Sequence, residues 1–154
     1  SPVASFPFHM VQKEKNGLAY RYYEGAWDRL PDYAALQPLR TGQVYDFDFS
    51  AIPAREDHFA VRYETVIEIP AAGLYTFYTS SNDGSRLYIN DQLVVDNDGA
   101  HSRREKSGTV SLAVGKAKLT VDYFEIAGMQ ELQVFYAGPD GVKQPLSPEM
   151  MFRP

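Results

Sequence analysis

The clearest pattern in the chain is the alternation of apolar and polar residues in HFAVRYETVIEI, residues 58–69. Aromatic and β-branched residues occupy every second position from the phenylalanine onward. The positions between them carry Arg62, Glu64 and Glu68, with Val66 as the one large apolar exception. Successive side chains of a β-strand point to opposite faces of the sheet. This period of two therefore predicts a long antiparallel strand with one buried face.

Similar but shorter runs lie on both sides of this segment, at 44–49, 110–114, 119–123 and 132–136. The second and third of these runs flank Gly115-Lys116, which predicts a hairpin. Between Asp32 and Leu39 we expect one short turn of helix. Many short strands separated by turn residues favour an all-β fold, either an antiparallel β-sandwich or a β-barrel.

The length and composition are those of one folded domain. The chain has 154 residues, of which 44% are hydrophobic and 14% aromatic, enough to bury a substantial core. A polar break at Lys13–Gly17 divides a lead-in segment, residues 1–16, from a β domain over 17–154. No apolar run is long enough to cross a bilayer, so no membrane insertion is expected.

Several classes of function are disfavoured by the charge and the missing motifs. A net charge of −5 without a dense basic patch disfavours nucleic acid as a partner. There are no cysteines, which excludes disulfides and cysteine zinc sites but leaves the compartment open. The chain lacks a Gly-x-Ser-x-Gly elbow, a phosphate-binding glycine loop and a His-Glu-x-x-His motif. We therefore expect a protein that is not an enzyme.

A cluster of carboxylates and amides brackets two short apolar runs, at residues 87–89 and 93–95. Oxygen atoms of this kind are the ligands that calcium takes in proteins. If the strand-end loops converge, the candidate oxygens are those of Asn82, Asp83, Asp96, Asn97 and Asp98. The alternative is that Asn, Asp and Gly are present because tight turns favour them.

Two residues outside this cluster are further candidates for ligand binding. Trp27 lies in loop-like sequence between Gly25 and Asp28, and an exposed indole can stack on a sugar ring. Its alternative role is in the core or as an anchor of the loop. His101 follows the carboxylate cluster in a polar loop and can donate a hydrogen bond to a ligand, with simple solvation as the alternative.

Several ordered motifs resemble those of the protective-antigen-type (PA-14) domain family. The opening GLAYRYYEG (17–25) resembles the start of the family domain, and PAAGLYTF (70–77) is similar to its Pro-x-x-Gly-x-Tyr-x-Phe strand. SNDGSRLYI (81–89) is similar to its Asp-Asp-Gly-x-x-Leu-x-Ile core. Tyr123-Phe124-Glu125 and Tyr136-Ala137-Gly138-Pro139 resemble its last two strands. The resemblance extends over nearly the whole chain.

This resemblance implies a β-sandwich or barrel of jelly-roll character that is an accessory domain of a larger protein. Family members occur in secreted glycosidases, adhesins and toxins, which implies an extracellular, periplasmic or cell-surface location. In the fungal adhesins, two adjacent aspartates joined by a cis peptide bind calcium, and the calcium contacts sugar hydroxyls. That pair falls on Asn82 and Asp83, so Asp83 matches whereas Asn82 removes one negative charge.

The resulting prediction is a non-catalytic, lectin-like carbohydrate-binding module of a secreted glycan-degrading protein, with calcium as its cofactor. Its partners would be a glycan and a neighbouring catalytic domain. The expected ligand-binding residues are Trp27, Asn82, Asp83, Gly84, Asn97 and His101. The expected metal ligands are Asn82, Asp83, Asp96 and Asp98. The alternative is an accessory domain that shapes the cleft of its catalytic neighbour without binding sugar.

Overall fold

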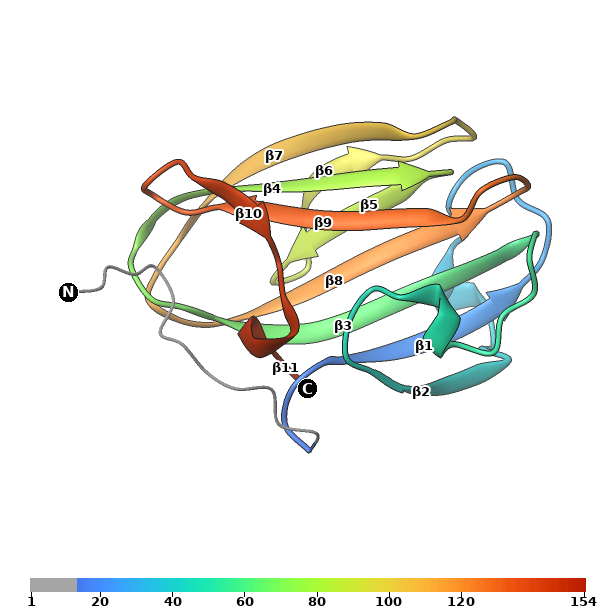
Figure 1. Cartoon of the computed structure of the whole chain (residues 1–154), viewed down its shortest axis with the longest axis horizontal. Helices are drawn as coiled ribbons and strands as arrows, with labels where there is room; N and C mark the ends of the chain where they lie inside the picture. Colours follow the sequence, from blue (N-terminus) through green and yellow to red (C-terminus); the bar gives the residue numbers. More distant parts are fainter. Residues whose placement is uncertain (1–13) are drawn as a thin grey trace.

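The computed structural model describes residues 14–154, which form two antiparallel β-sheets packed against each other (Figure 1). The order of the larger sheet is β2 (Arg40–Val44), β1 (Leu18–Glu24), β3 (Phe59–Ile69), β8 (Gly115–Glu125), β5 (Ser85–Ile89) and β6 (Gln92–Asn97), with β11 (Met151–Phe152) also pairing with β3. The order of the smaller sheet is β10 (Lys143–Pro145), β9 (Glu131–Ala137), β4 (Gly73–Asn82) and β7 (Arg104–Leu112). The predicted all-β sandwich is confirmed.

Three short 3₁₀ helices, η1 (Tyr33–Ala35), η2 (Phe49–Ala51) and η3 (Pro148–Met150), are the helical elements of residues 14–154. The first of them confirms the turn of helix expected after Asp32, whose side chain caps it by accepting a hydrogen bond from the backbone N–H of Ala34. No helix in the described part of the chain is long and apolar enough to span a membrane. Most of the predicted lead-in segment, 1–16, lies outside the described residues.

The alternating segment that dominates the sequence forms β3, a central strand of the larger sheet. It pairs with β8 along its whole length, from Phe59 opposite Glu125 to Ile69 opposite Gly115. The predicted inward positions are buried, and they pack against side chains of the smaller sheet in the main core. Ala60 is also buried, on the opposite face, because another segment covers that face.

That covering segment is the loop between β1 and β2, residues 25–39, which lies over the outer face of the larger sheet. Tyr33 of this loop donates a hydrogen bond to the carbonyl oxygen of Tyr123 at 2.9 Å, and its ring packs with Tyr23 and Phe124 in a second apolar cluster. Arg62 stacks on the same ring, 4.8 Å from its centroid. The loop thereby buries the β8 positions that would otherwise face solvent.

Two predictions about the sheets are wrong. The 44–49 run is not a strand beyond Val44, because Asp48 caps η2 and takes that segment out of the sheet. The strands on either side of Gly115 form no hairpin with each other, since β7 pairs with β4 and β8 pairs with β3 and β5. The chain crosses between the sheets at this turn, and only long-range pairing decides that.

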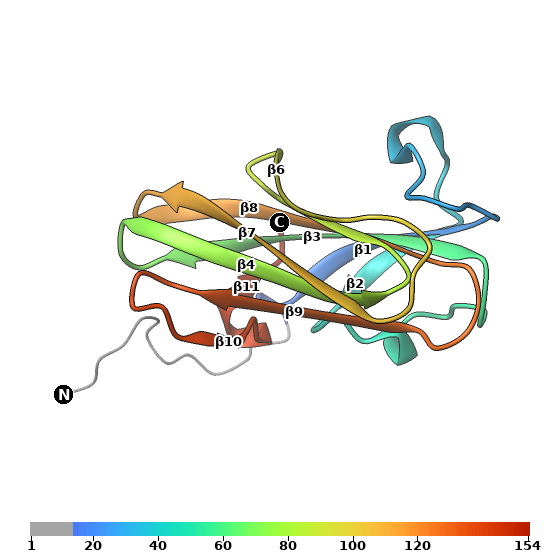
Figure 2. The same ribbon diagram turned by 90° about the horizontal axis from the view of Figure 1, so that it is seen from above.

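The strands β5 and β6 form a hairpin with each other. Asn90 and Asp91 have φ angles of 50° and 67°, the left-handed pair that a tight two-residue hairpin turn requires. At the other end of the hairpin, the turn from β4 to β5 and the loop from β6 to β7 lie at one end of the sandwich. The 25–39 loop and the β8–β9 loop reach the same end, on the right in Figures 1 and 2. This loop end contains the candidate site.

Candidate ligand-binding site

The turn from β4 to β5 contains a cis peptide bond between Asn82 and Asp83. Because Asn82 replaces the first aspartate of the family motif, the sequence did not decide whether this peptide bond is cis. In the structure it is cis. The carbonyl oxygen of Asn82 accepts a hydrogen bond from the hydroxyl of Tyr123 on β8. The half-buried side chain of Asn82 makes no hydrogen bond within residues 14–154, so its amide oxygen is available to a ligand.

The Asp83 carboxylate connects three loops of this end. It is nearly buried, and one oxygen accepts a hydrogen bond from the backbone N–H of Ile126 at 2.9 Å. The other oxygen accepts one from the backbone N–H of His101 at 3.2 Å. Each carboxylate oxygen can accept two hydrogen bonds. Asp83 therefore orders the loops around it and keeps lone pairs for a further partner.

Glu125, the last residue of β8, is the residue that sequence reasoning missed as a site residue. Glu125 is 1% exposed, and within residues 14–154 no cationic side chain pairs with its carboxylate; its polar neighbours are the Asp83 carboxylate and the backbone of Ala127. Burial, then the hydrogen bond and the charge of the Asp83 carboxylate, with the charge of Asp57 adding to them, raises the pKa of Glu125 to about 9. A buried carboxylate without a cationic partner is costly, so this environment favours either a bound proton or a bound cation.

A signal for Glu125 was present in the sequence. The apolar segment Val121–Phe124 ends in a charged residue, and an acid at the end of a buried strand needs a partner. Nothing local, however, shows that this acid lies beside Asp83. That proximity arises because β8 lies between β3 and β5 in the larger sheet, which brings its end to the turn after β4.

Asn97 supports the loop from β6 to β7 from inside. Its side chain is fully buried, and its Nδ2 group donates to the carbonyl oxygens of Arg104 at 2.8 Å and Thr79 at 3.2 Å. Its Oδ1 atom accepts from Nε of Arg104 at 2.9 Å. The structure therefore places Asn97 beneath the loop surface, not on it where a ligand would make contact.

His101 is held by its own loop. Nε2 lies 2.8 Å from the carbonyl oxygen of Asn97, and Nδ1 lies 2.7 Å from that of Ser102. Together with the hydrogen bond from its backbone to Asp83, these contacts make His101 the residue that joins this loop to the cis turn. Gly84 of the cis turn also lies close to this loop, because a Cβ atom there would be only 2.8 Å from the backbone nitrogen of Gly99.

Asp96 and Asp98 both interact with Arg86. Arg86 donates from Nε to Asp96 at 3.0 Å, and its Nη2 lies 3.5 Å from Asp98. The second oxygen of Asp98 accepts from the backbone N–H of Leu30 at 2.8 Å. Within residues 14–154, no group of three or more histidine, aspartate or glutamate side chains is arranged to hold a metal ion. Arg86 therefore engages two of the four predicted metal ligands, and their assignment to a metal stays a prediction.

Trp27 is an anchor of the 25–39 loop with part of its ring exposed. A Cβ atom on Gly25 would lie 2.7 Å from the indole, so the ring packs directly on that glycine. Trp27 also packs against the second apolar cluster, which contains Phe124. The Phe124 ring in turn lies against Gly84, since a Cβ atom there would approach it to 2.5 Å. Trp27 thus belongs to the same end of the molecule as the cis turn.

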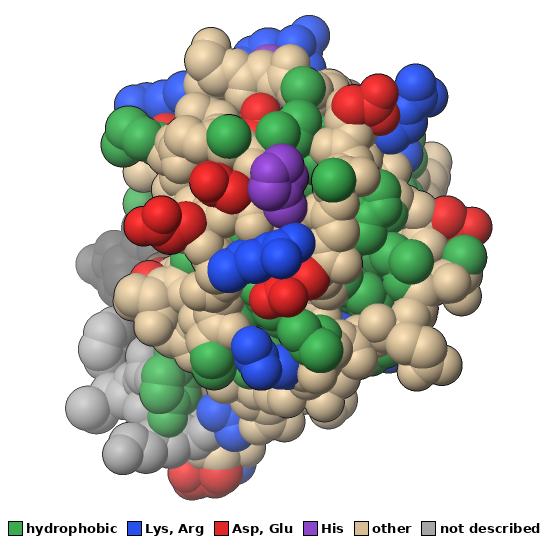
Figure 3. Space-filling model, turned by 90° about the vertical axis from the view of Figure 1, so that its right-hand side faces the viewer, with side chains coloured by type: hydrophobic (Ala, Val, Ile, Leu, Met, Phe, Trp, Pro, Cys, Tyr) green, Lys and Arg blue, Asp and Glu red, His purple; other side chains and the backbone are tan. Residues whose placement is uncertain are grey.

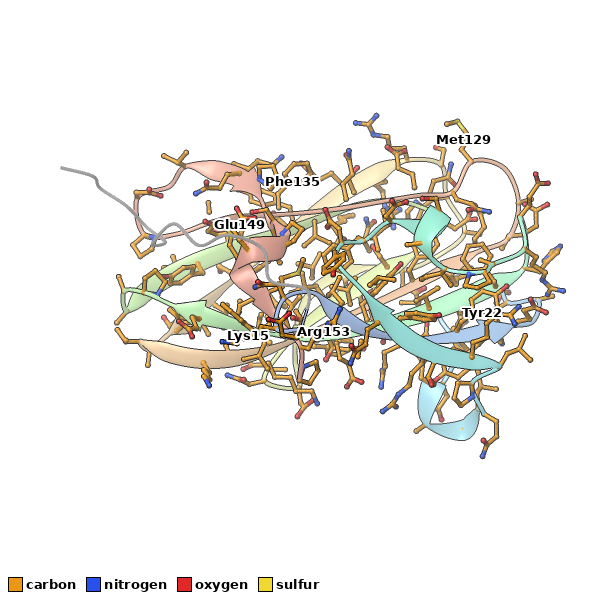
Figure 4. The ribbon with its side chains drawn as sticks, turned by 60° about the horizontal axis from the view of Figure 1, so that its bottom comes forward. Lys15, Tyr22, Met129, Phe135, Glu149 and Arg153 are labelled. Atoms are coloured by element: carbon orange, nitrogen blue, oxygen red, sulfur yellow. The ribbon has the colours of Figure 1, made fainter. Side chains whose placement is uncertain are left out.

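The β8–β9 loop completes this end. Gln130 donates from its side chain to the carbonyl oxygen of Glu56 at 2.6 Å and so attaches the loop to the segment before β3. Met129 projects from the loop and is 74% exposed (Figure 4). A hollow of about 630 Å³ lies between Glu56-Asp57 and the tip of this loop. Figure 3 shows acidic, basic and hydrophobic side chains interspersed over this end of the molecule.

The sandwich topology and the cis turn at the end of β4 can now be compared with known proteins. The PA14 domain family model matches residues 14–149. The chain belongs to the PA14 domain family. Among curated proteins, the anti-sigma-I factor RsgI3 of Acetivibrio thermocellus is 30% identical over 108 residues, which is 70% of this chain. The match covers 17% of that relative, so the chain corresponds to a small part of its length.

Solved PA14 domains have the same fold. An anti-sigma factor domain-containing protein superposes with a TM-score of 0.76 at 24% identity, over 95% of this chain and 50% of that one. A PA14 sugar-binding domain from an RTX adhesin superposes with a TM-score of 0.72 at 19% identity, over 90% of this chain and 99% of that one. At these identities the similarity establishes the fold of this PA14 domain. The class of ligand has to be inferred from the residues of the site.

Proposed function

We propose that this PA14 domain is a non-catalytic glycan-binding module whose site is the cis turn, with calcium as its cofactor. The single observation that carries the proposal is the buried carboxylate of Glu125 beside that of Asp83, two acids with which no cationic side chain of the described residues pairs. A cation would provide the missing partner of Glu125. The solved sugar-binding PA14 domain of the RTX adhesin, which has the same fold, supports glycan as the ligand class.

The donor set suits calcium. Two carboxylates, from Asp83 and Glu125, lie together at this turn, and Asn82 beside Asp83 adds an unengaged amide oxygen. Calcium takes oxygen ligands of both types. Glu125 also supplies the negative charge that Asn82 lacks relative to the aspartate pair of the fungal adhesins. When bound, calcium would supply ligation of neighbouring hydroxyls of a sugar ring.

The other residues of this end would position the sugar. The exposed part of Trp27 offers an apolar face for a pyranose ring, and Met129 extends the opposite loop into solvent. Gly84 lets the turn pack closely against Phe124 and Gly99, because any side chain at this position would collide with both residues. A module of this kind would act outside the cell or at its surface, next to a catalytic domain of a glycan-degrading protein.

The test is isothermal titration calorimetry of wild type and Glu125→Gln against a glycan panel, with calcium and with EDTA. We expect calcium-dependent binding by wild type and its loss in Glu125→Gln. The matched control is Glu68→Gln, the same change at an exposed position of β3 remote from the turn. Binding that is equal in calcium and in EDTA would remove calcium from the proposal. Absence of binding to every glycan, in both buffers, would overturn it.

The alternative is an accessory domain that shapes the cleft of a neighbouring catalytic domain without binding sugar. Such a domain needs an interface with that neighbour on its surface. The buried core of such an interface is more apolar than the rest of the protein surface. The large exposed apolar side chains of residues 14–154 come from several strands and loops, at Leu39, Tyr45, Leu74, Leu93, Val114, Met129 and Val142.

A further inference from the structure

A second hollow, of about 440 Å³, lies between the 25–39 loop and the start of the 98–103 loop. Unlike the rest of this acidic protein, its lining carries more positive than negative side chains. Four cationic residues line it, Arg29, Arg86, Arg104 and Lys106, against three aspartates. The whole chain, by contrast, carries a net charge of −5. A local excess of positive charge on an acidic domain needs an explanation.

The carboxylates of the hollow are already engaged. Asp96 and Asp98 both interact with Arg86, at 3.0 Å and 3.5 Å, and Asp98 also accepts the backbone hydrogen bond from Leu30. These contacts compensate the charge of Arg86 and connect the 25–39 loop to the 98–103 loop. Asp28 pairs with Arg29 at 3.7 Å, both largely exposed, and a pair of that kind contributes little.

Two cations of the hollow form no salt bridge within the described residues, although Arg104 lies close enough to Asp96 to lower the pKa of that carboxyl. Arg104 donates from Nε to the Asn97 side chain and from Nη2 to the Asp98 carbonyl oxygen at 3.0 Å, and both acceptors are neutral. The Lys106 ammonium group has no hydrogen bond or ion pair within the described residues. The two residues stand two positions apart on β7, so they lie on the same face of that strand. They form one positive edge of the hollow.

This hollow adjoins the proposed glycan site. Gly99 lines it, and the same residue packs against Gly84 of the cis turn. Two residues further on, the backbone of His101 bonds to Asp83. A single short loop therefore separates the proposed calcium ligands from the positive edge. A sugar bound at the turn would have its next ring close to Arg104 and Lys106.

We propose that this hollow binds the negatively charged group of an anionic glycan, a carboxylate or a sulfate, on the sugar next to the one held at the cis turn. The inference rests on the proposed glycan site and adds the class of glycan. The guanidinium of Arg104 is fixed by its two hydrogen bonds and keeps donors for an anion. The flexible ammonium of Lys106 adds a second positive charge from the same side.

The experiment is a titration of the whole chain in calcium with three short oligosaccharides of equal length. One is neutral (galactose units), one carries carboxylates (galacturonic acid units), and one is a sulfated galactose oligomer. The proteins are wild type, Lys106→Gln and the control Lys116→Gln, whose exposed lysine lies outside the hollow at the start of β8. Both lysines are exposed, so both variants are expected to fold.

We expect at least one charged oligosaccharide to bind more tightly than the neutral one. Lys106→Gln should weaken that binding about two- to fivefold, the usual range for one exposed charge pair, and leave the neutral ligand unchanged. Lys116→Gln should change neither. Raising the salt concentration should weaken the charged ligand selectively, because exposed charges are screened. The charged ligand that responds to Lys106→Gln identifies the anion as carboxylate or sulfate.

Two results would overturn the inference, and they differ from failure of the proposed function. Equal affinity for the neutral and both charged oligosaccharides would overturn it and leave the glycan site standing. So would a Lys106→Gln variant that behaves as Lys116→Gln does. If no oligosaccharide binds, neutral or charged, the glycan site itself fails and the anion preference fails with it.

Discussion

The carboxylate of Asp83 accepts a hydrogen bond from the backbone N–H of Ile126 at 2.9 Å. This bond joins the turn after β4 to the first residue of the loop after β8, more than forty positions later in the chain. A second bond from the same carboxylate reaches His101. One side chain thus holds together the loops that would surround a ligand, whether or not a cation is present.

Asp83→Ala should therefore destabilise the protein even in EDTA. Removing a nearly buried carboxylate that accepts two backbone hydrogen bonds should lower the free energy of unfolding by about 2–3 kcal/mol. Urea denaturation of the chelator-treated protein measures this. Glu68→Ala, on the exposed face of β3, is the control and should change stability by less than about 0.5 kcal/mol. Equal stability of Asp83→Ala and wild type would contradict this role.

The stability of the calcium-free protein should fall as pH rises toward 9. The pKa of Glu125 is raised from an ordinary 4.5 to about 9 in the folded state. Between these values the folded protein keeps a proton that the unfolded chain has lost, so each step up in pH favours unfolding. The slope for one group is at most about 1.4 kcal/mol per pH unit.

Urea denaturation in EDTA at several pH values between 6 and 9 tests this. Glu125→Gln carries a neutral group of similar shape, so it should remove the slope and be the more stable protein at the high end. The control Glu68→Gln should retain the wild-type slope. If Glu125→Gln and wild type fall in parallel with pH, the carboxylate is not the group that titrates.

Calcium should raise the melting temperature of wild type. A ligand that binds only the folded state stabilises it by about 2.7 kcal/mol at a concentration of one hundred times its dissociation constant. Thermal denaturation with calcium, with magnesium and with EDTA should show the largest increase in calcium. Asp83→Asn and Glu125→Gln should each reduce that increase, whereas Glu68→Gln should preserve it. If calcium raises the melting temperature of all four proteins equally, it does not bind at the cis turn.

Gly84→Ala should damage the turn by collision. A Cβ atom there would lie 2.5 Å from the ring of Phe124 and 2.8 Å from the backbone of Gly99. Overpacking of this kind costs about 1–3 kcal/mol and should displace the 98–103 loop. Gly138→Ala is the matched control, because its nearest contact would be an ordinary 3.4 Å. Denaturation and glycan titration of the two variants give the comparison, and equal behaviour would refute a steric role for Gly84.

The sequence predicts this fold where the information is local. The alternation that produces β3 and the Asn90-Asp91 turn that produces the β5–β6 hairpin are properties of short segments. The errors occur where distant segments decide. The run after Val44 has the pattern of a strand, yet Asp48 caps a 3₁₀ turn there, and the strands around Gly115 belong to different sheets.

The residues of the candidate site also divide into those that local sequence predicts and those that depend on distant segments. Asn82 and Asp83 were found because the motif around them is contiguous in sequence. Glu125 was missed as a site residue, and the pairing of Asp96 and Asp98 with Arg86 was not predicted, because burial and pairing depend on which strands become neighbours. Arg86 lies opposite Asp96 in the β5–β6 pairing and takes that carboxylate. No spacing rule along the chain reveals this.

The two halves of the proposed recognition surface come from different strands. The residues at the cis turn stand at the ends of β4 and β8, where Asp83 also holds the loops in place. The positive edge stands on β7, where the Lys106 ammonium group makes no hydrogen bond or ion pair with the described residues. Evolution can therefore change Lys106 to reverse or remove the preference for charged sugars without cost to the fold. Substitutions at Asp83 have no such freedom, since each would be selected for loop order and for ligand at once.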